Sequence, residues 1–152
     1  MKGCLLIHGL TGTPATLATV QSALLTAGFR VSSPCLAGHG TTVDDLANST
    51  WEDWYETVHA AYQNLRRNVS KVYCVGISLG SLLCLKLALD EGWGVRALGL
   101  IATPLQLSLP SRLAIPVVKW TPLKWAVKRI PKNLEKSVAD PEGQKLYEEF
   151  SL

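Results

Sequence analysis

The sequence has little of what marks a membrane or secreted protein. It contains no apolar run near the roughly 20 residues that a bilayer-spanning helix needs. Its first apolar run, Cys4–Ile7, has four residues and is interrupted by His8, whereas the core of a signal peptide has roughly 7–15. We therefore expect a cytoplasmic protein without a transmembrane segment.

A strong excess of charge of one sign is also missing. Lys and Arg number 15, Asp and Glu number 12, and 47% of the residues are hydrophobic. This balance excludes an intrinsically disordered chain, which combines low hydrophobicity with high net charge. The length of 152 residues is that of one domain with enough apolar content for a core.

Charge is nonetheless uneven towards the C-terminal end. Residues 1–110 carry seven basic and seven acidic side chains, residues 111–136 seven and one, and residues 137–152 one and four. The basic segment lacks the surroundings of any nucleic-acid-binding fold, so no nucleic-acid partner is predicted. Residues 105–152 also hold five of the eight prolines and no evident strand, which indicates a separate structural unit.

The four cysteines form no C-x-x-C pair, and no histidine stands at zinc-binding distance from them. We therefore predict neither a metal site, nor a disulfide, nor any cofactor. Cys4, Cys74 and Cys84 lie inside apolar stretches, where a thiol behaves as a small hydrophobic side chain and is buried. Cys35 is interpreted as a loop thiol without an assigned role.

Short apolar runs alternate with longer segments of helical periodicity. The apolar runs predict strands at residues 4–7, 29–32, 71–76 and 95–101. The periodic segments predict helices at residues 14–27, 50–67 and 79–90. Thr13 would cap the first helix, Pro14 would begin it and Gly28 would end it. Strands separated by helices form βαβ units, so we expect an α/β fold, a three-layer sandwich with a parallel sheet.

One pentapeptide of this sequence carries a chemical signature. Gly76-Ile77-Ser78-Leu79-Gly80 has the form G-x-S-x-G and joins a predicted strand to a predicted helix. A nucleophile elbow requires this setting, because its turn is too tight for bulky side chains two residues before and after the serine. The following helix N-terminus would offer N–H groups to an anion. The alternative is a glycine-rich turn with a bystander serine.

A second loop follows the first predicted strand directly. His8-Gly9-Leu10-Thr11-Gly12 occupies the place where a hydrolase with such an elbow carries its other oxyanion donor. Acyl transfer needs two N–H groups aimed at the developing oxyanion, and the backbones of Leu10 and Leu79 are the candidates. We interpret His8 itself as a structural hydrogen-bonding residue rather than a base.

Taken together, these motifs resemble the α/β-hydrolase fold, and most of all small bacterial carboxylesterases and monoacylglycerol lipases. The resemblance rests on the two motifs above and on three more, namely Gly38-His39-Gly40, Trp51-Glu52-Asp53-Trp54 and Ala102-Thr103-Pro104. It implies an N-terminal part of the hydrolase core over residues 1–104 and the start of a lid over residues 105–152. It also implies Ser78 as nucleophile, with the Leu10 and Leu79 backbones as oxyanion hole, and a non-catalytic His39.

The sequence departs from this family in its triad. The order in this fold is Ser, then Asp or Glu, then His, yet the histidines stand at 8, 39 and 59, all before Ser78. Asp90 and Asp140 follow the serine, but neither matches the acid position, and His59 is interpreted as a helix-face residue. The triad acid and histidine are therefore expected to be absent, and the core to be incomplete at its C-terminus.

Two functions remain open at this point. The first is a serine hydrolase of short- or medium-chain esters or monoacylglycerols, acting through an acyl-enzyme. The second is an inactive remnant or binding module. Tryptophans and basic side chains alternate over residues 117–129. This pattern would suit contact with a lipid–water interface or a lid over an acyl pocket. A solvated basic lid is the simpler interpretation. The oligomeric state is not predicted. Without the last strands, one sheet edge would be uncovered.

Overall fold

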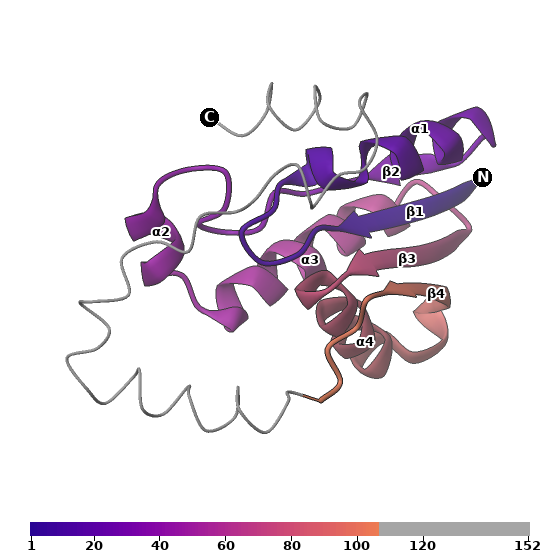
Figure 1. Ribbon diagram of the computed structural model, residues 1–152. Coiled ribbons are helices and arrows are strands. Elements are labelled where there is room, and N and C mark those ends of the chain that lie inside the picture. Colours follow the sequence, from indigo (N-terminus) through magenta and orange to yellow (C-terminus); the bar gives the residue numbers. More distant parts are fainter. Residues whose placement is uncertain (107–152) are drawn as a thin grey trace.

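The computed structural model describes residues 1–106, and a sheet of four parallel strands lies at its centre (Figure 1). The strands are β1 (Lys2–Ile7), β2 (Arg30–Ser32), β3 (Lys71–Ile77) and β4 (Val95–Ile101), in the order β2-β1-β3-β4. The segments between them are helical: η1 (Pro14–Leu17), α1 (Ala18–Thr26), α2 (Val43–Asn48), α3 (Trp51–Arg66), α4 (Leu79–Glu91) and η2 (Gly92–Gly94). The predicted α/β fold with a parallel sheet is confirmed.

The alternating side chains of β1 divide the core into two parts. Leu5 and Ile7 point to the face covered by α3 and α4, where they join a cluster that includes Tyr62. Cys4 and Leu6 point to the opposite face and pack with residues of η1 and α1. Successive side chains of a strand alternate between the two faces of its sheet. Helices therefore cover both faces of β1, which makes the three layers of a sandwich.

The first helical segment begins as the sequence predicts. Thr13 occupies the N-cap position, Pro14 is the first helical residue, and Gly28, with φ +76°, follows the end of α1. The first turn is a 3₁₀ turn, so one predicted helix is divided into η1 and α1. The short helix α2 was not predicted. Its signal is a capping box in which Thr42 Oγ1 accepts the N–H of Asp45 at 3.1 Å.

The cysteines lie where their neighbours in sequence predict. Cys4, Cys74 and Cys84 are buried and free, while Cys35 is exposed in the loop after β2. Burial raises the pKa of the Cys4 thiol to about 12. Cys4 is therefore a neutral core side chain at physiological pH.

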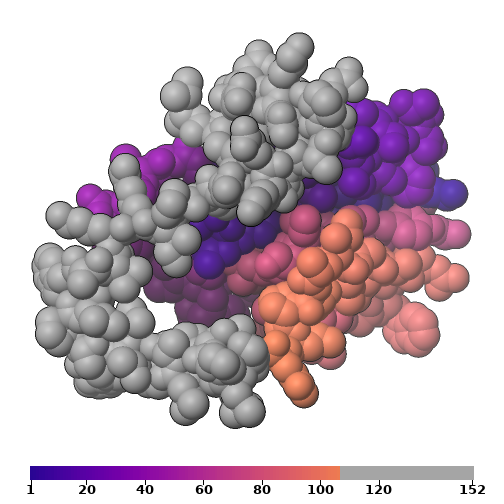
Figure 2. All heavy atoms as spheres, viewed as in Figure 1, coloured from indigo at the N-terminus to yellow at the C-terminus, as the bar shows by residue number. Residues whose placement is uncertain are grey.

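At the outer side of the sheet, β4 pairs with β3 and with no other strand of the described part of the chain. Figure 2 shows its residues, in orange, at the surface of the molecule. Leu100 and Ile101 near its end are 40% and 41% exposed. The predicted lid residues from 107 onward, including the segment 117–129, lie outside the described residues. Among residues 1–106, no helix is both long and apolar enough to cross a membrane.

Candidate active site

Ser78 lies alone at the turn between β3 and α4. The strand ends at Ile77 and the helix begins at Leu79. The backbone of Ser78 has φ 53° and ψ −118°, in a region that residues other than glycine rarely adopt. A serine keeps such a conformation only where the surrounding structure holds it, and positions of this kind cluster at functional sites.

The two glycines of the pentapeptide allow this turn to form. A Cβ atom on Gly76 would collide with the carbonyl group of Gly80. A Cβ atom on Gly80 would collide with the backbone of Ile7 and lie 2.6 Å from the carbonyl oxygen of His8. Gly76 thus lets the helix start close against its own strand, and Gly80 lets it start close against β1. Both positions require glycine for steric reasons.

Hydrogen bonds from β4 hold the turn from the other side. The N–H of Ser78 donates to the carbonyl oxygen of Ile101 at 2.8 Å. The hydroxyl of Ser81 lies 2.7 Å from the carbonyl oxygen of Gly76 and 3.1 Å from that of Ile101. Ser81 is fully buried. This role of Ser81 was not predicted, because its local signal is no more than a small polar residue inside a strongly apolar helix.

The loop after β1 runs beside Ser78. A Cβ atom on Gly9 would lie 3.3 Å from Ser78 Cβ and 3.9 Å from Ser78 Oγ. Leu10, the next residue, is 52% exposed, and a turn closed by the hydrogen bond from Gly12 N–H to Gly9 O at 3.0 Å holds the loop. The structure therefore brings together the two motifs that the sequence analysis singled out.

Two backbone amides, at the start of α4 and in the loop after β1, donate to no acceptor within residues 1–106. Leu79 is the first residue of α4, and the first N–H groups of a helix have no partner within it. Among residues 1–106, neither the Leu79 N–H nor the Leu10 N–H donates a hydrogen bond. The positive end of the α4 dipole lies at the same place. The turn can therefore offer N–H donors to an anion beside the serine oxygen.

His8 is engaged through both of its ring nitrogens. The N–H of Leu36 donates to His8 Nε2 at 3.0 Å, so this nitrogen carries no proton. Nδ1 consequently holds the proton and donates it to the carbonyl oxygen of Gly9 at 2.9 Å. The ring is fully buried, and burial lowers the pKa of His8 to about 4. His8 is thus a neutral side chain that joins the loops after β1 and β2 through hydrogen bonds. This is the structural role that the sequence predicts, and the ring is not available as a base.

His39 lies behind the same loop. Its ring is buried, its Nδ1 lies 3.0 Å from the carbonyl oxygen of Ala37, and its Nε2 has no partner among residues 1–106. Edge contacts join the His39 ring to His8, with centroids 5.1 Å apart, and to Trp54, at 5.5 Å. The three rings form a continuous packed group under the loops after β1 and β2.

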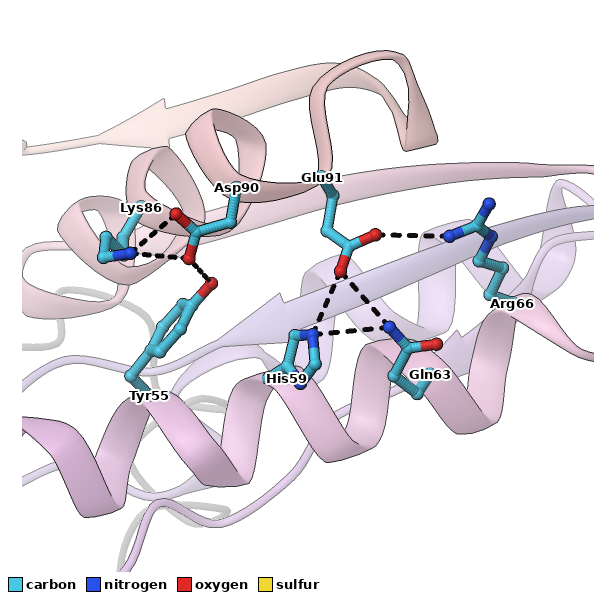
Figure 3. A network of polar contacts seen from close by, with 7 residues as sticks. All are labelled: Tyr55, His59, Gln63, Arg66, Lys86, Asp90 and Glu91. Carbon is cyan, nitrogen blue, oxygen red and sulfur yellow. Dashed lines mark hydrogen bonds and ion pairs between the residues drawn. The ribbon is translucent and has the colours of Figure 1, made fainter.

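The third histidine belongs to a polar network between α3 and α4 (Figure 3). His59 Nε2 lies 3.0 Å from Glu91 Oε1, the Gln63 amide donates to the same oxygen at 3.2 Å, and Arg66 binds Glu91 Oε2 at 3.2 Å. Glu91 thus binds His59, Gln63 and Arg66, all on α3. His59 is a helix-face residue, as the sequence predicts, and its imidazole joins α3 to α4.

Asp90 belongs to the same helix–helix junction. Lys86 Nζ lies 2.6 Å from both carboxylate oxygens, and the Tyr55 hydroxyl donates to one of them. These hydrogen bonds, the Lys86 ones first, lower the pKa of Asp90. Along a helix axis, Asp90 is about 18 Å from Ser78, because each residue adds roughly 1.5 Å. In the described part of the chain, no carboxylate or imidazole hydrogen bonds to Ser78.

A cleft of about 500 Å³ lies between the start of α1 and the loop after β2. Thr13, Ala18, Cys35 and Gly40 are among the residues that line it. Cys35 Sγ donates to the carbonyl oxygen of His39 at 3.2 Å, and partial burial raises the pKa of this thiol. Cys35 is therefore a protonated wall of the cleft at neutral pH rather than a nucleophile.

The sequence of this chain matches a known family over nearly its whole length. Residues 4–150 match the profile of the alpha/beta hydrolase family. The chain belongs to this family, and its parallel sheet with a serine at the sharp turn after β3 agrees with that membership.

Two curated relatives are bacterial. The chain is 38% identical over 86 residues to a thermostable monoacylglycerol lipase from Bacillus sp. (strain H-257), an alignment that covers 57% of this chain and 34% of the relative. It is 32% identical over 87 residues to a carboxylesterase from Bacillus subtilis (strain 168), covering 57% and 35%. The aligned part therefore spans about a third of the length of each relative.

Solved structures share the architecture. One, from a study of the metagenome-derived lipolytic enzymes LipS and LipT, superposes with a TM-score of 0.71 at 30% identity, covering 75% of this chain and 46% of that one. The thioesterase domain from the curacin biosynthetic pathway gives a TM-score of 0.73 at 18% identity, over 97% and 58% of the two chains. The second likeness concerns the fold alone.

Proposed function

We propose that this chain carries the nucleophile and the oxyanion hole of a serine hydrolase that cleaves carboxylic esters. Ser78 is the nucleophile, on a nucleophile elbow, and the backbone N–H groups of Leu10 and Leu79 form the oxyanion hole. The observation that carries the proposal is the conformation of Ser78, a positive-φ serine at a strand–helix turn with Gly9 packed against it. Such a turn exposes the serine oxygen above the sheet.

The reaction follows from this placement. Ser78 Oγ attacks the ester carbonyl carbon while its proton passes to a base, and the carbonyl oxygen becomes an oxyanion held by the two N–H groups. The C–O bond to the alcohol then breaks, the alcohol leaves with a proton, and the acyl group stays on Ser78. Water hydrolyses this acyl-enzyme, which releases the carboxylic acid and restores the hydroxyl.

The base has to come from outside the three histidines of the sequence. Both nitrogens of His8 are engaged, His39 is packed under the loops, and His59 binds Glu91. We propose that an imidazole and a carboxylate beyond these 152 residues complete the triad. Without them the hydroxyl is a weak nucleophile, because nothing takes its proton.

The substrate we propose is an uncharged short- or medium-chain ester or a monoacylglycerol. The support is the likeness to a monoacylglycerol lipase and a carboxylesterase, at 38% and 32% identity. Contact of residues 117–129 with a lipid–water interface, a lid from residue 105 and a cytoplasmic location stay predictions from the sequence.

The test is turnover of p-nitrophenyl butyrate by the protein that contains this chain, together with labelling by a fluorophosphonate probe. Ser78→Ala is expected to lower kcat at least about a thousandfold and to abolish labelling. Ser70→Ala, an exposed serine at the other end of the sheet, is the matched control and should leave both unchanged. Equal turnover by Ser78→Ala and the parent would refute the assignment of Ser78. Absence of turnover and labelling in the parent would favour a binding module instead.

A further inference from the structure

Every strand of the sheet begins at or next to a basic residue. Arg30, Lys2 and Lys71 are the first residues of β2, β1 and β3, and Arg96 is the second residue of β4. Because all four strands are parallel, these side chains lie at one edge of the sheet, where the arrows of Figure 1 begin. Lys2 and Lys71 are direct partners in the β1–β3 register. All four residues are exposed.

In the described part of the chain, basic and acidic residues are therefore separated in space, although their numbers are equal. Arg66 and Arg67, at the end of α3, add to the basic edge. Five acidic residues lie on α2 and the first half of α3 instead, namely Asp44, Asp45, Glu52, Asp53 and Glu56. α3 runs antiparallel to the strands, so its first half lies towards the opposite edge. The acids that end α4 are already paired with side chains of α3 and α4.

A pocket of about 270 Å³ opens at this basic edge. Its walls include Lys71, Arg96, Arg66 and Trp93. Arg66 shares its charge with Glu91, whereas Lys71 and Arg96 form no ion pair among residues 1–106. A base at a helix C-terminus is explained by the helix dipole, which accounts for Arg66. Lys71 and Arg96 lie on strands, so this explanation does not extend to them.

Trp93 projects from the surface on the short turn η2. Its side chain is 95% exposed, and it stands in the middle of η2, between Gly92 and Gly94. A Cβ atom on Gly94 would collide with the hydroxyl of the buried Tyr62, so the turn packs directly on the core. The indole consequently offers an exposed flat face at the mouth of a pocket whose Lys71 and Arg96 form no ion pair within residues 1–106.

We propose that this pocket binds the phosphate group of a small molecule whose flat portion stacks on Trp93. Lys71 and Arg96, which have no ion-pair partner in the described part of the chain, and Arg66, which also binds Glu91, match a phosphate dianion better than a carboxylate, which carries one charge. The planar guanidinium of Arg96 can bind two phosphate oxygens at once, and Lys71 supplies a compact charge. The site lies at the opposite edge of the sheet from Ser78, so it is independent of the proposed hydrolysis.

Isothermal titration of the full chain with adenosine monophosphate, inorganic phosphate and adenosine separates the two parts of the site. Adenosine monophosphate is expected to bind more tightly than phosphate, and adenosine without phosphate not to bind. Lys71→Gln and Arg96→Gln should each weaken both phosphate-bearing probes about tenfold, as loss of one charge-assisted hydrogen bond predicts. Trp93→Ala should lower the affinity for adenosine monophosphate to that for inorganic phosphate. It should leave the affinity for inorganic phosphate unchanged.

Arg30→Gln is the matched control, because Arg30 is an exposed base at the same edge that does not line the pocket. It should leave the affinities unchanged, and an equal loss in this variant would show diffuse charge instead of a site. Lack of saturable binding of both phosphate-bearing probes would also overturn the proposal. A final arm uses phosphatidylcholine vesicles with and without phosphatidylglycerol. If the protein bound the anionic vesicles but none of the soluble probes, and Lys71→Gln abolished this binding, the pocket would be a site for a lipid headgroup. That result would overturn the proposal of a soluble ligand.

Discussion

The N–H of Ser78 donates to the carbonyl oxygen of Ile101 at 2.8 Å, which ties the turn after β3 to the last residue of β4. Ala102, the next residue, has φ +49°, so the chain bends away at once after making this bond. The position of the serine is therefore set by three strands. β3 leads into it, β1 packs against Gly80, and β4 binds its amide.

Ser81 reinforces this link, and its removal tests it. Ser81→Ala removes a buried hydroxyl that has the Gly76 carbonyl oxygen and the part-buried Ile101 carbonyl oxygen as alternative acceptors. Its loss costs about 1–3 kcal/mol of unfolding free energy. We expect a lower kcat with a nearly unchanged KM, because the change shifts the position of Ser78 and removes no side chain that we place against the substrate. Chemical denaturation and p-nitrophenyl butyrate kinetics measure the two effects.

Ser22→Ala is the control for this prediction. Ser22 is exposed on α1, and its hydroxyl forms no hydrogen bond within residues 1–106. Its replacement should change the stability by less than about 0.5 kcal/mol. If Ser81→Ala lost stability but kept the parent kcat, Ser81 would be a structural residue only and not a positioning one.

The steric role of Gly80 gives a second prediction. In Gly80→Ala the new methyl group meets the backbone of Ile7 and His8, which cannot move without disrupting β1. We expect a loss of several kcal/mol, of the order of 4, or failure to fold. In Gly28→Ala the methyl group meets nothing within 4 Å, and only the φ of +76° opposes it, which costs about 1–2 kcal/mol. Urea unfolding midpoints compare the two variants, and equal losses would contradict the close approach of α4 to β1.

Sequence reasoning succeeded where the signal is local. The turn at Ser78, the start of the first helix at Pro14 and the burial of Cys74 depend on residues within a few positions of each. It failed for α2, because a capping box without apolar periodicity was not enough to predict six residues of helix. The elements themselves were placed to within one or two residues of the observed bounds for all four strands.

Contacts between distant segments could not be predicted. Ser81 and Ile101 are 20 residues apart, and His59 and Glu91 are 32 apart. The sequence around each of these residues does not indicate its partner, because the strand order β2-β1-β3-β4 decides which segments meet. The charge pattern is a similar case. Residues 1–110 contain equal numbers of acids and bases, and only the parallel arrangement of the strands gathers the bases at one edge.

The buried neutral His8 predicts a dependence of stability on pH. Burial lowers the pKa of His8 from 6.5 to about 4 in the folded protein, so the unfolded chain binds a proton more readily than the folded one. The stabilisation is complete above pH 6.5 and is lost as the pH falls from 6.5 towards 4. The full loss is about 3 kcal/mol, since one pKa unit corresponds to roughly 1.4 kcal/mol.

Unfolding of the parent and of His8→Gln between pH 7 and pH 4 checks this prediction, because the difference between the two isolates His8. The variant is less stable at pH 7, since it cannot keep both hydrogen bonds, but its stability should fall less over this range. Hydrogen bonds lower the pKa values of Asp45 and Asp90, so these residues stabilise the folded protein fully above pH 3.8 and lose this effect at lower pH. Parallel curves for parent and variant would show that His8 is not the group responsible.

The last prediction concerns the carboxylates of α4. Asp90 and Glu91 follow Ser78 in the sequence, as a triad acid would, but both are held in the α3–α4 network of Figure 3. Glu91→Gln keeps the shape of the side chain and removes the charge that Arg66 and His59 share. We expect it to lower the unfolding free energy by about 1 kcal/mol, because the carboxylate is partly buried.

Neither Glu91→Gln nor Asp90→Asn should change the rate at which a fluorophosphonate labels Ser78 in the protein that contains this chain. The reason is distance, since roughly 18 Å of helix separates these carboxylates from the serine. A drop of tenfold or more in labelling, with unfolding curves that show the variant still folded, would place one of them in the catalytic machinery. Unchanged labelling with the expected loss of stability would confine both residues to joining α3 and α4, and would support the proposal that neither of them is the triad acid.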